Sequence, residues 1–182
     1  MAYRVFKSDL SVKGLRQLKK DLRAYQRQTL PNLMEQFVTE LANEGVTVAK
    51  IHAGQFSPYL AFVVEIKDTK YNYKCTAVMV GQNAIPNIKT WFHDNELISR
   101  EVNSLMMAEY GAGQFADPPK YRGTFPEQTH AKEDHWWYAT EKDAEGKFIW
   151  HQAQGTIPTR PMLNARDAII RRCNAVARRV FG

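Results

Sequence analysis

The last quarter of the chain carries the pattern that most constrains its fold. Pro158 and Pro161 stiffen residues 155–162, because each proline fixes its own φ and disfavours helix at the residue before it. Pro161 suits the first turn of a helix, where its missing N–H costs nothing. The following residues predict a helix to Phe181 with one apolar stripe at helical spacing. The stripe comprises Met162, Ala165, Ile169, Cys173, Val176 and Val180. Arginines fill much of the remaining surface, so the stripe requires an apolar partner upstream.

Apolar residues three and four positions apart predict helix over residues 11–53. Pro31 is expected to end or kink this run near residues 28–30, which gives two long helices or one kinked helix. Basic side chains crowd the first part of the run: Lys13, Arg16, Lys19, Lys20, Arg23 and Arg27. We expect these charges to be spread around the helix, which favours a solvated or subunit-facing helix. Contact with DNA phosphates is the alternative, and each basic contact would then add salt-dependent affinity.

The middle of the chain changes to strand patterns. Alternating apolar and polar residues predict a hairpin with strands near 59–67 and 70–80, and a third strand is expected at 88–93. Asn95 is placed to cap a helix over 96–109, and Gly111 suits the left-handed cap at its end. Residues 114–133 predict a long loop. Residues 135–138 and 147–151 predict a second hairpin around the turn at Glu145-Gly146.

Together these elements predict a single domain of residues 1–182 with an α+β fold. It has a long N-terminal helix kinked or broken near Pro31, an antiparallel or mixed sheet with hairpins, a middle helix, and a C-terminal helix packed on the sheet.

No run approaches the roughly 18 apolar residues of a membrane span. The start resembles no signal peptide, and Cys75 and Cys173 match no metal or redox spacing, so synthesis in a reducing cytosol is expected. The formal charge of +6 permits contact with nucleic acid or an acidic protein surface without establishing either.

The sequence lacks the motifs that carry common catalytic and cofactor chemistry. It has no glycine-rich phosphate loop, no His-Glu-x-x-His, no nucleophile elbow and no Cys-x-x-Cys, so we expect no enzyme, cofactor or metal site. Three weaker clusters have residue types that could carry chemistry: a metal set (His130, Asp134, His135, His151), an acid/base set (Asp94, Glu96, Glu101) and a base-stacking set (Trp136, Trp137, Tyr138, Trp150). The favoured interpretations are surface or strand-pair histidines for the first set, and helix capping and solvation for the second. For the third set, aromatic packing between sheet and helix, or between subunits, is favoured.

Four segments, in order along the chain, resemble a known family. They are Lys13-Gly14-Leu15-Arg16-Gln17-Leu18-Lys19-Lys20-Asp21-Leu22, then Glu109-Tyr110-Gly111-Ala112-Gly113, then Trp136-Trp137-Tyr138, and finally Gly155-Thr156-Ile157-Pro158-Thr159-Arg160-Pro161-Met162. Their order and spacing are similar to those of the tailed-bacteriophage neck or tail-completion (head–tail joining) proteins typified by gene product 10 of phage HK97. Ala112 departs from the family's small hydroxyl residue, and the family's proximal Pro-x-[Asp/Arg]-Thr-Gly-x-Leu segment is missing.

The resemblance implies a non-enzymatic structural protein of the virion, assembled in the cytoplasm of a bacterial host. Copies would form a homo-oligomeric ring, a hexamer or dodecamer, in the neck between the head connector and the tail tube. DNA would pass through its lumen. Its partners would be the connector or stopper protein and the tail terminator or tail tube protein, with no membrane. The residues implied to shape turns near a subunit contact are Glu109, Tyr110, Gly111, Gly113, Pro158, Arg160, Pro161 and Met162; purely local caps and turns are the alternative.

Two further classes of function stay open at this point. A nucleic-acid-binding domain acting outside the virion would show salt-sensitive binding of free DNA by a monomer. A small hydrolase or metalloprotein would show turnover or bound stoichiometric metal.

Overall fold

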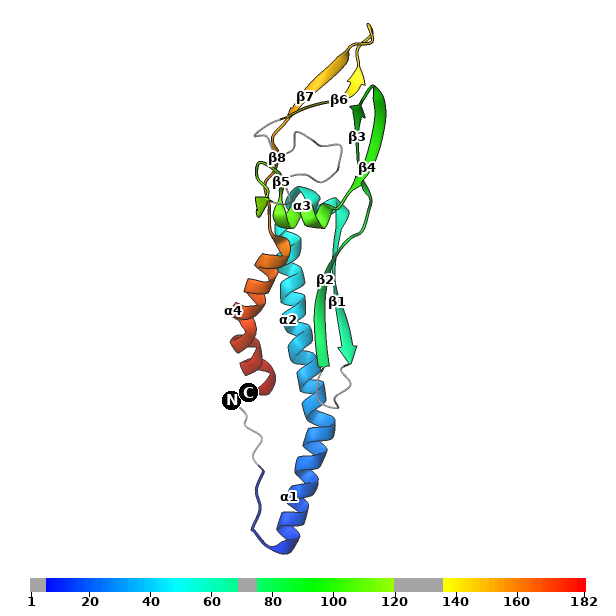
Figure 1. The fold of residues 1–182 in the computed structure, drawn as a ribbon. Coiled ribbons are helices and arrows are strands. Elements are labelled where there is room, and N and C mark those ends of the chain that lie inside the picture. Colours follow the sequence, from blue (N-terminus) through cyan, green and yellow to red (C-terminus); the bar gives the residue numbers. More distant parts are fainter. Residues whose placement is uncertain (1–5, 69–74, 120–135) are drawn as a thin grey trace. The chain divides into compact units, whose positions relative to one another are not determined.

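The computed structural model describes residues 6–68, 75–119 and 136–182. The α+β class is confirmed, with helices at both ends of the chain and paired strands between them (Figure 1). The chain divides into two compact units, each built from several stretches. Unit 1 comprises Met1–Thr47, Val63–Val80 and Ala165–Gly182, and unit 2 comprises Val48–Phe62 and Gly81–Asn164. Organisation as a single domain stays a prediction.

Unit 1 begins with the long helical run expected from the sequence. Helix α1 (Val12–Ala24) starts at Ser11, whose side-chain oxygen accepts the N–H of Gly14 at 3.0 Å. A π-helical turn (Tyr25–Thr29) joins it to α2 (Leu30–His52). Pro31 lacks an N–H, and its ring crowds the carbonyl four residues earlier. The wider turn, in which the Leu30 N–H reaches back to the Tyr25 carbonyl, lies immediately before this proline, so the helical run continues through it.

Helix α4 (Pro161–Phe181) runs beside α2 in the opposite direction within unit 1 (Figure 1). The rings of Phe37 and Phe181 lie 5.4 Å apart, and Arg172 Nε donates to Glu44 at 2.9 Å. A Cβ at Gly45 would lie 2.7 Å from the Ile169 side chain, so the glycine permits this close approach. The sequence predicted that the terminal helix packs on the sheet. The structure instead supplies its apolar partner from α2, and the predicted stripe is buried there at Ala165 and Val176.

The first strand pair is formed by β1 (Leu60–Asp68) and β2 (Cys75–Asn83). Its position agrees with the strands expected near 59–67 and 70–80, although residues 69–74 lie outside the described part of the chain. Within unit 1, β2 lies against α2. The sulfur of Met79 on β2 is 3.1 Å from the position that a Cβ at Gly45 on α2 would take.

Unit 2 corrects one expectation of the sequence. The helix predicted over 96–109 is two elements, strand β4 (Glu96–Val102) and helix α3 (Ser104–Tyr110), and Asn103 rather than Asn95 caps the helix. Asp94 and Asn95 both adopt positive φ, +48° and +71°, which is the backbone of a tight two-residue hairpin turn. That turn pairs β4 with β3 (Asn87–His93) in antiparallel register.

The second predicted hairpin is confirmed as β6 (Trp136–Lys142) and β7 (Phe148–Ala153). It contacts β3 through the rings of Phe92 and Phe148, 5.0 Å apart. Two short strands, β5 (Ala112–Gly113) and β8 (Gly155–Thr156), form a further antiparallel pair, and a 3-10 helix (Gly54–Tyr59) precedes β1. Most of the loop predicted at 114–133 lies outside the described residues. None of the described helices combines the length and the apolar character needed to cross a membrane.

Candidate subunit-contact site

The two segments singled out near Gly111 and near Pro158 meet in unit 2. Strands β5 and β8 pair them directly, with Ala112 opposite Thr156 and Gly113 opposite Gly155. The two segments are more than forty positions apart in the sequence. Their meeting makes one compact junction between the end of α3 and the start of α4, and we call it the α3–α4 junction. It comprises residues 108–117 and 155–163.

Glu109 ties the two helices of the junction together. One oxygen of its carboxylate accepts the backbone N–H of Met162 at 2.9 Å, and the other accepts that of Leu163 at 3.1 Å. These amides belong to the first turn of α4, where backbone N–H groups have no partner inside the helix. A carboxylate also complements the positive end of the helix dipole. Glu109 therefore caps α4 from a distant part of the chain, and its side chain is half-buried.

Gly111 occupies a conformation that other residues avoid. Its φ is +74° and its ψ −171°, a region essentially reserved for glycine, rather than the left-handed helical cap that the sequence suggested. Its N–H donates to the Met107 carbonyl at 2.9 Å, so it still closes α3. A Cβ here would lie 2.6 Å from the Thr156 carbonyl oxygen and 2.9 Å from Pro158 Cδ. The glycine is required by backbone angle and by space together.

Arg160 precedes α4 and also holds an unusual backbone. Its φ of +53° is left-handed, which costs a side-chain-bearing residue about 1–2 kcal/mol. Its N–H and that of Thr159 donate to the Ala108 carbonyl at 2.9 and 2.8 Å. Its guanidinium pairs with the carboxylate of Asp117. These bonds hold the strained residue in place and join three stretches of unit 2 at one point.

The remaining predicted site residues lie in the same junction. Pro161 is fully buried at the first position of α4, Pro158 lies beside Gly111, and Tyr110 is the last residue of α3. Met162 reaches the strands, since a Cβ at Gly81 would lie 2.9 Å from its sulfur. The structure thus brings all eight predicted residues together. The roles of Ala108 and Asp117 are not visible in the sequence, because a backbone carbonyl and a surface carboxylate carry no motif.

An open groove of about 500 Å³ lies on the surface of the junction. It is lined by Gln55, Phe115, Gln154, Gly155, Thr156, Ile157 and Thr159. Two of its apolar side chains face solvent, with Ile157 65% and Phe115 37% exposed. The lining has no charged group, and four of its side chains are polar amides or hydroxyls.

The acid/base set and the base-stacking set lie on two different hairpins of unit 2. Asp94 lies in the β3–β4 turn, and Glu96 and Glu101 lie on β4, so the helix-capping part of the expectation is wrong. All three side chains are exposed, so the expected solvation is confirmed. Within the described residues, no three side chains of the metal-ligating types come together; His130, Asp134 and His135 lie outside that part. On the β6–β7 hairpin Trp137 and Trp150 are 56% and 57% exposed, so neither is packed inside the chain.

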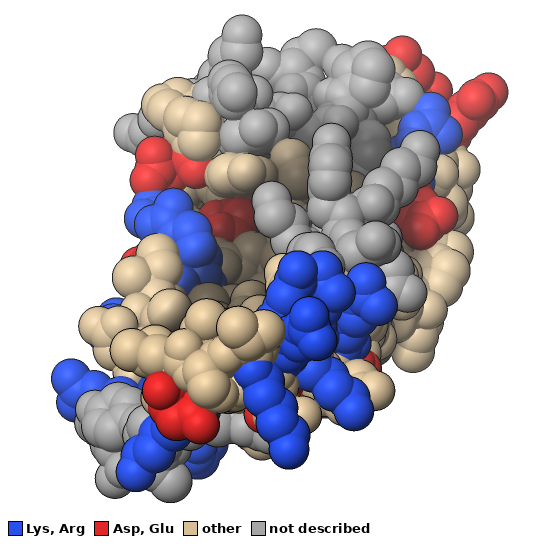
Figure 2. All heavy atoms as spheres, turned by 90° about the horizontal axis from the view of Figure 1, so that it is seen from below, with Lys and Arg blue, Asp and Glu red and all other residues tan. Residues whose placement is uncertain are grey.

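Lysine and arginine side chains gather in clusters on the surface seen from below (Figure 2). Unit 1 holds 16 of the 25 Lys and Arg residues and 8 of the 19 Asp and Glu residues, so its formal charge is +8 and that of unit 2 is −2. On α1 the basic side chains are not spread around the helix, contrary to the expectation. At 100° per residue, five of them fall within about 120° of its circumference. They are Lys13, Arg16, Lys19, Lys20 and Arg23, and we call them the α1 basic stripe.

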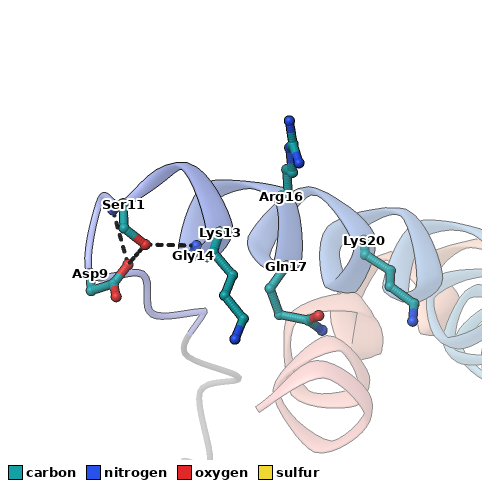
Figure 3. Close-up of a pocket in the computed structure, with 7 residues that line it drawn as sticks. All are labelled: Asp9, Ser11, Lys13, Gly14, Arg16, Gln17 and Lys20. Carbon is teal, nitrogen blue, oxygen red and sulfur yellow. Dashed lines mark hydrogen bonds between the residues drawn. The ribbon is translucent and has the colours of Figure 1, made fainter.

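The basic stripe begins beside the capped end of α1 (Figure 3). Ser11 and Asp9 fill that end: the Ser11 hydroxyl and N–H both donate to Asp9 Oδ1, at 2.7 and 3.0 Å. These bonds hold the pKa of Asp9 below its ordinary value. In this view Arg16 points away from Lys13 and Lys20, which project to the same side of the helix (Figure 3). A plot of the sequence at helical angles would have found this arrangement.

The chain was compared with family models, curated proteins and solved structures, and none of them matches it.

Proposed function

We propose that this chain is a non-enzymatic structural subunit of a tailed-bacteriophage virion. Copies form a homo-oligomeric ring in the neck, which completes the tail or joins head to tail. On this proposal its neighbours are a head connector or stopper protein and a tail terminator or tail tube protein. DNA passes through the lumen, and assembly takes place in the cytoplasm of the bacterial host.

The observation that carries the proposal is the α3–α4 junction. The proposal rests on motifs in a particular order, and two of these motifs, at 109–113 and 155–162, form a single hydrogen-bonded feature through Glu109 and the β5–β8 pair. Each motif residue there has a physical reason to be what it is. That interdependence supports a shared architecture over chance similarity of short segments.

Two further observations support self-assembly. The junction exposes Ile157 beside its open groove, and β6–β7 exposes two tryptophans, which are enriched at protein interfaces. The two units also carry formal charges of opposite sign. A head-to-tail contact, in which unit 1 of one copy meets unit 2 of the next, matches these charges and closes into a ring under cyclic symmetry.

A pair of matched variants tests the junction as the subunit contact. Ile157 is 65% exposed on the junction, and Ile88 is 61% exposed on β3, elsewhere in unit 2. We expect Ile157→Glu to reduce the mass measured by light scattering to that of smaller species, because a charge is buried without a partner in the contact. Ile88→Glu is expected to assemble as the unchanged chain does. If Ile157→Glu assembles into full rings, the junction is not part of the subunit contact.

The second candidate is a nucleic-acid-binding domain acting outside the virion, and the α1 basic stripe is the observation that favours it. The two candidates differ in where the protein is found. The ring protein is a stoichiometric component of purified phage particles, whereas the second candidate stays in the lysate as a monomer that binds free DNA.

A further inference from the structure

We infer that the α1 basic stripe binds the phosphate backbone of double-stranded nucleic acid without reading its sequence. The inference does not depend on ring formation, since the stripe lies on a single helix of one copy. It assigns a binding surface and a ligand chemistry to a helix that buries none of its own residues.

The charges of the stripe are not paired within the described chain. Its five side chains form no ion pair with any described acidic group, whereas on α4 Arg172 and Arg179 pair with Glu44 and Glu40. Like charges three and four residues apart on a helix repel one another. Arg16 stands in this relation to both Lys19 and Lys20. The arrangement therefore lowers the stability of α1 in isolation, and a polyanion lying along the stripe removes that cost.

The dimensions of the stripe suit a duplex. From Lys13 to Arg23 it extends about 15 Å along the helix axis, at about 1.5 Å per residue. Double-stranded DNA carries one negative charge per about 1.7 Å of its axis, so several phosphates face the stripe at once. An α-helix with its side chains is about 10–12 Å across, similar to the major groove at about 12 Å.

The neighbouring groups point to phosphates rather than base edges. At the border of the stripe the side-chain amide of Gln17 donates to Asp21 at 2.7 Å, so this donor is occupied within the helix. At the start of α1 the N–H groups of Gly14 and Ser11 are likewise occupied, by the Ser11 hydroxyl and the Asp9 carboxylate. The lysine and arginine side chains remain to make contact, and contacts of this type with phosphates position a protein on DNA without specifying sequence.

The test compares two matched double variants of the full chain. Arg16→Gln/Arg23→Gln removes two charges seven residues apart from the stripe, and Arg171→Gln/Arg178→Gln removes two exposed arginines with the same spacing from α4. Binding of a short fluorescein-labelled DNA duplex is measured by anisotropy as a function of salt. Five phosphate contacts predict a loss of affinity of about 500-fold between about 50 and 200 mM salt, and three contacts a loss of about 40-fold.

We expect the α1 variant to show the smaller salt dependence and weaker binding on duplexes of unrelated sequence, and the α4 variant to bind as the unchanged chain does. Equal effects of the two variants would overturn the inference, because general positive charge would then explain the binding. Binding of poly-glutamate or of anionic lipid vesicles as tightly as the duplex would also overturn it. Light scattering on the same variants measures assembly independently of DNA binding. An α1 variant that keeps the mass of the unchanged chain but loses DNA binding shows that the stripe binds DNA and is not needed for assembly.

Discussion

Glu109 gives the sharpest quantitative prediction, because its carboxylate connects two helices that are distant in sequence. Glu109→Ala removes both bonds to the first turn of α4, at 2.9 and 3.1 Å. Loss of a helix cap costs about 0.5–2 kcal/mol, and loss of a charge at a helix N-terminus costs about 0.3–1 kcal/mol more. The side chain is half-buried, so water replaces the lost bonds only in part. We therefore expect the free energy of unfolding to fall by about 2 kcal/mol.

The assay is thermal and urea unfolding followed by circular dichroism. For a chain of this length, about 2 kcal/mol corresponds to a fall in Tm of about 4–8 °C. Glu109→Gln keeps one acceptor oxygen and is expected to lose about half as much. Glu101→Ala is the control, because Glu101 is exposed on β4. If Glu109→Ala and Glu101→Ala unfold within about 0.5 kcal/mol of each other, the capping argument is refuted.

Three further predictions address other contacts. Gly111→Ala is expected to destabilise the fold by clearly more than Gly146→Ala. Both glycines have positive φ, which costs alanine about 1–2 kcal/mol, but only at Gly111 would the new Cβ clash with backbone atoms. Urea unfolding of the two variants measures the difference in the free energy of unfolding. Hydrogen bonds from Gln36 and Arg179 hold the pKa of Glu40 below its ordinary value of 4.5. Its contribution to stability is therefore present above about pH 4.5 and lost as the pH falls through the folded-state pKa, so Glu40→Gln is expected to flatten the fall in Tm on acidification. Ser11→Ala is expected to fray α1 at a cost of about 1 kcal/mol, visible as lost amide protection in hydrogen exchange.

The elements predicted correctly were those specified by local chemistry. Pro161 fixed the start of α4, and the apolar stripe after it fixed the extent of the helix. The β6–β7 hairpin followed from alternation around a glycine turn. The error at 96–102 arose because Leu97, Ile98 and Val102 fit helical spacing as well as strand spacing. The strand forms because residues 96–102 pair with β3 through a turn of two positive-φ residues. That pairing depends on another segment of the chain and cannot be seen in the spacing of residues 96–102 alone.

The candidate site was accessible only in part from the sequence. Motif order singles out the segments around Gly111 and Pro158. The cap that Glu109 places on α4 cannot be seen in a local pattern, because Met162 and Leu163 follow Glu109 by 53 and 54 positions. The partner of α4 was placed wrongly because an apolar stripe does not reveal which apolar surface covers it; the close approach at Gly45 settles the choice for α2. The basic stripe was missed although helical angles alone define it.

The most direct measurement of the central claim is electron microscopy of the purified chain in negative stain. The account predicts closed rings of uniform size with cyclic symmetry and a central opening wide enough for duplex DNA. Single copies without rings, at every protein concentration and salt concentration examined, would contradict it.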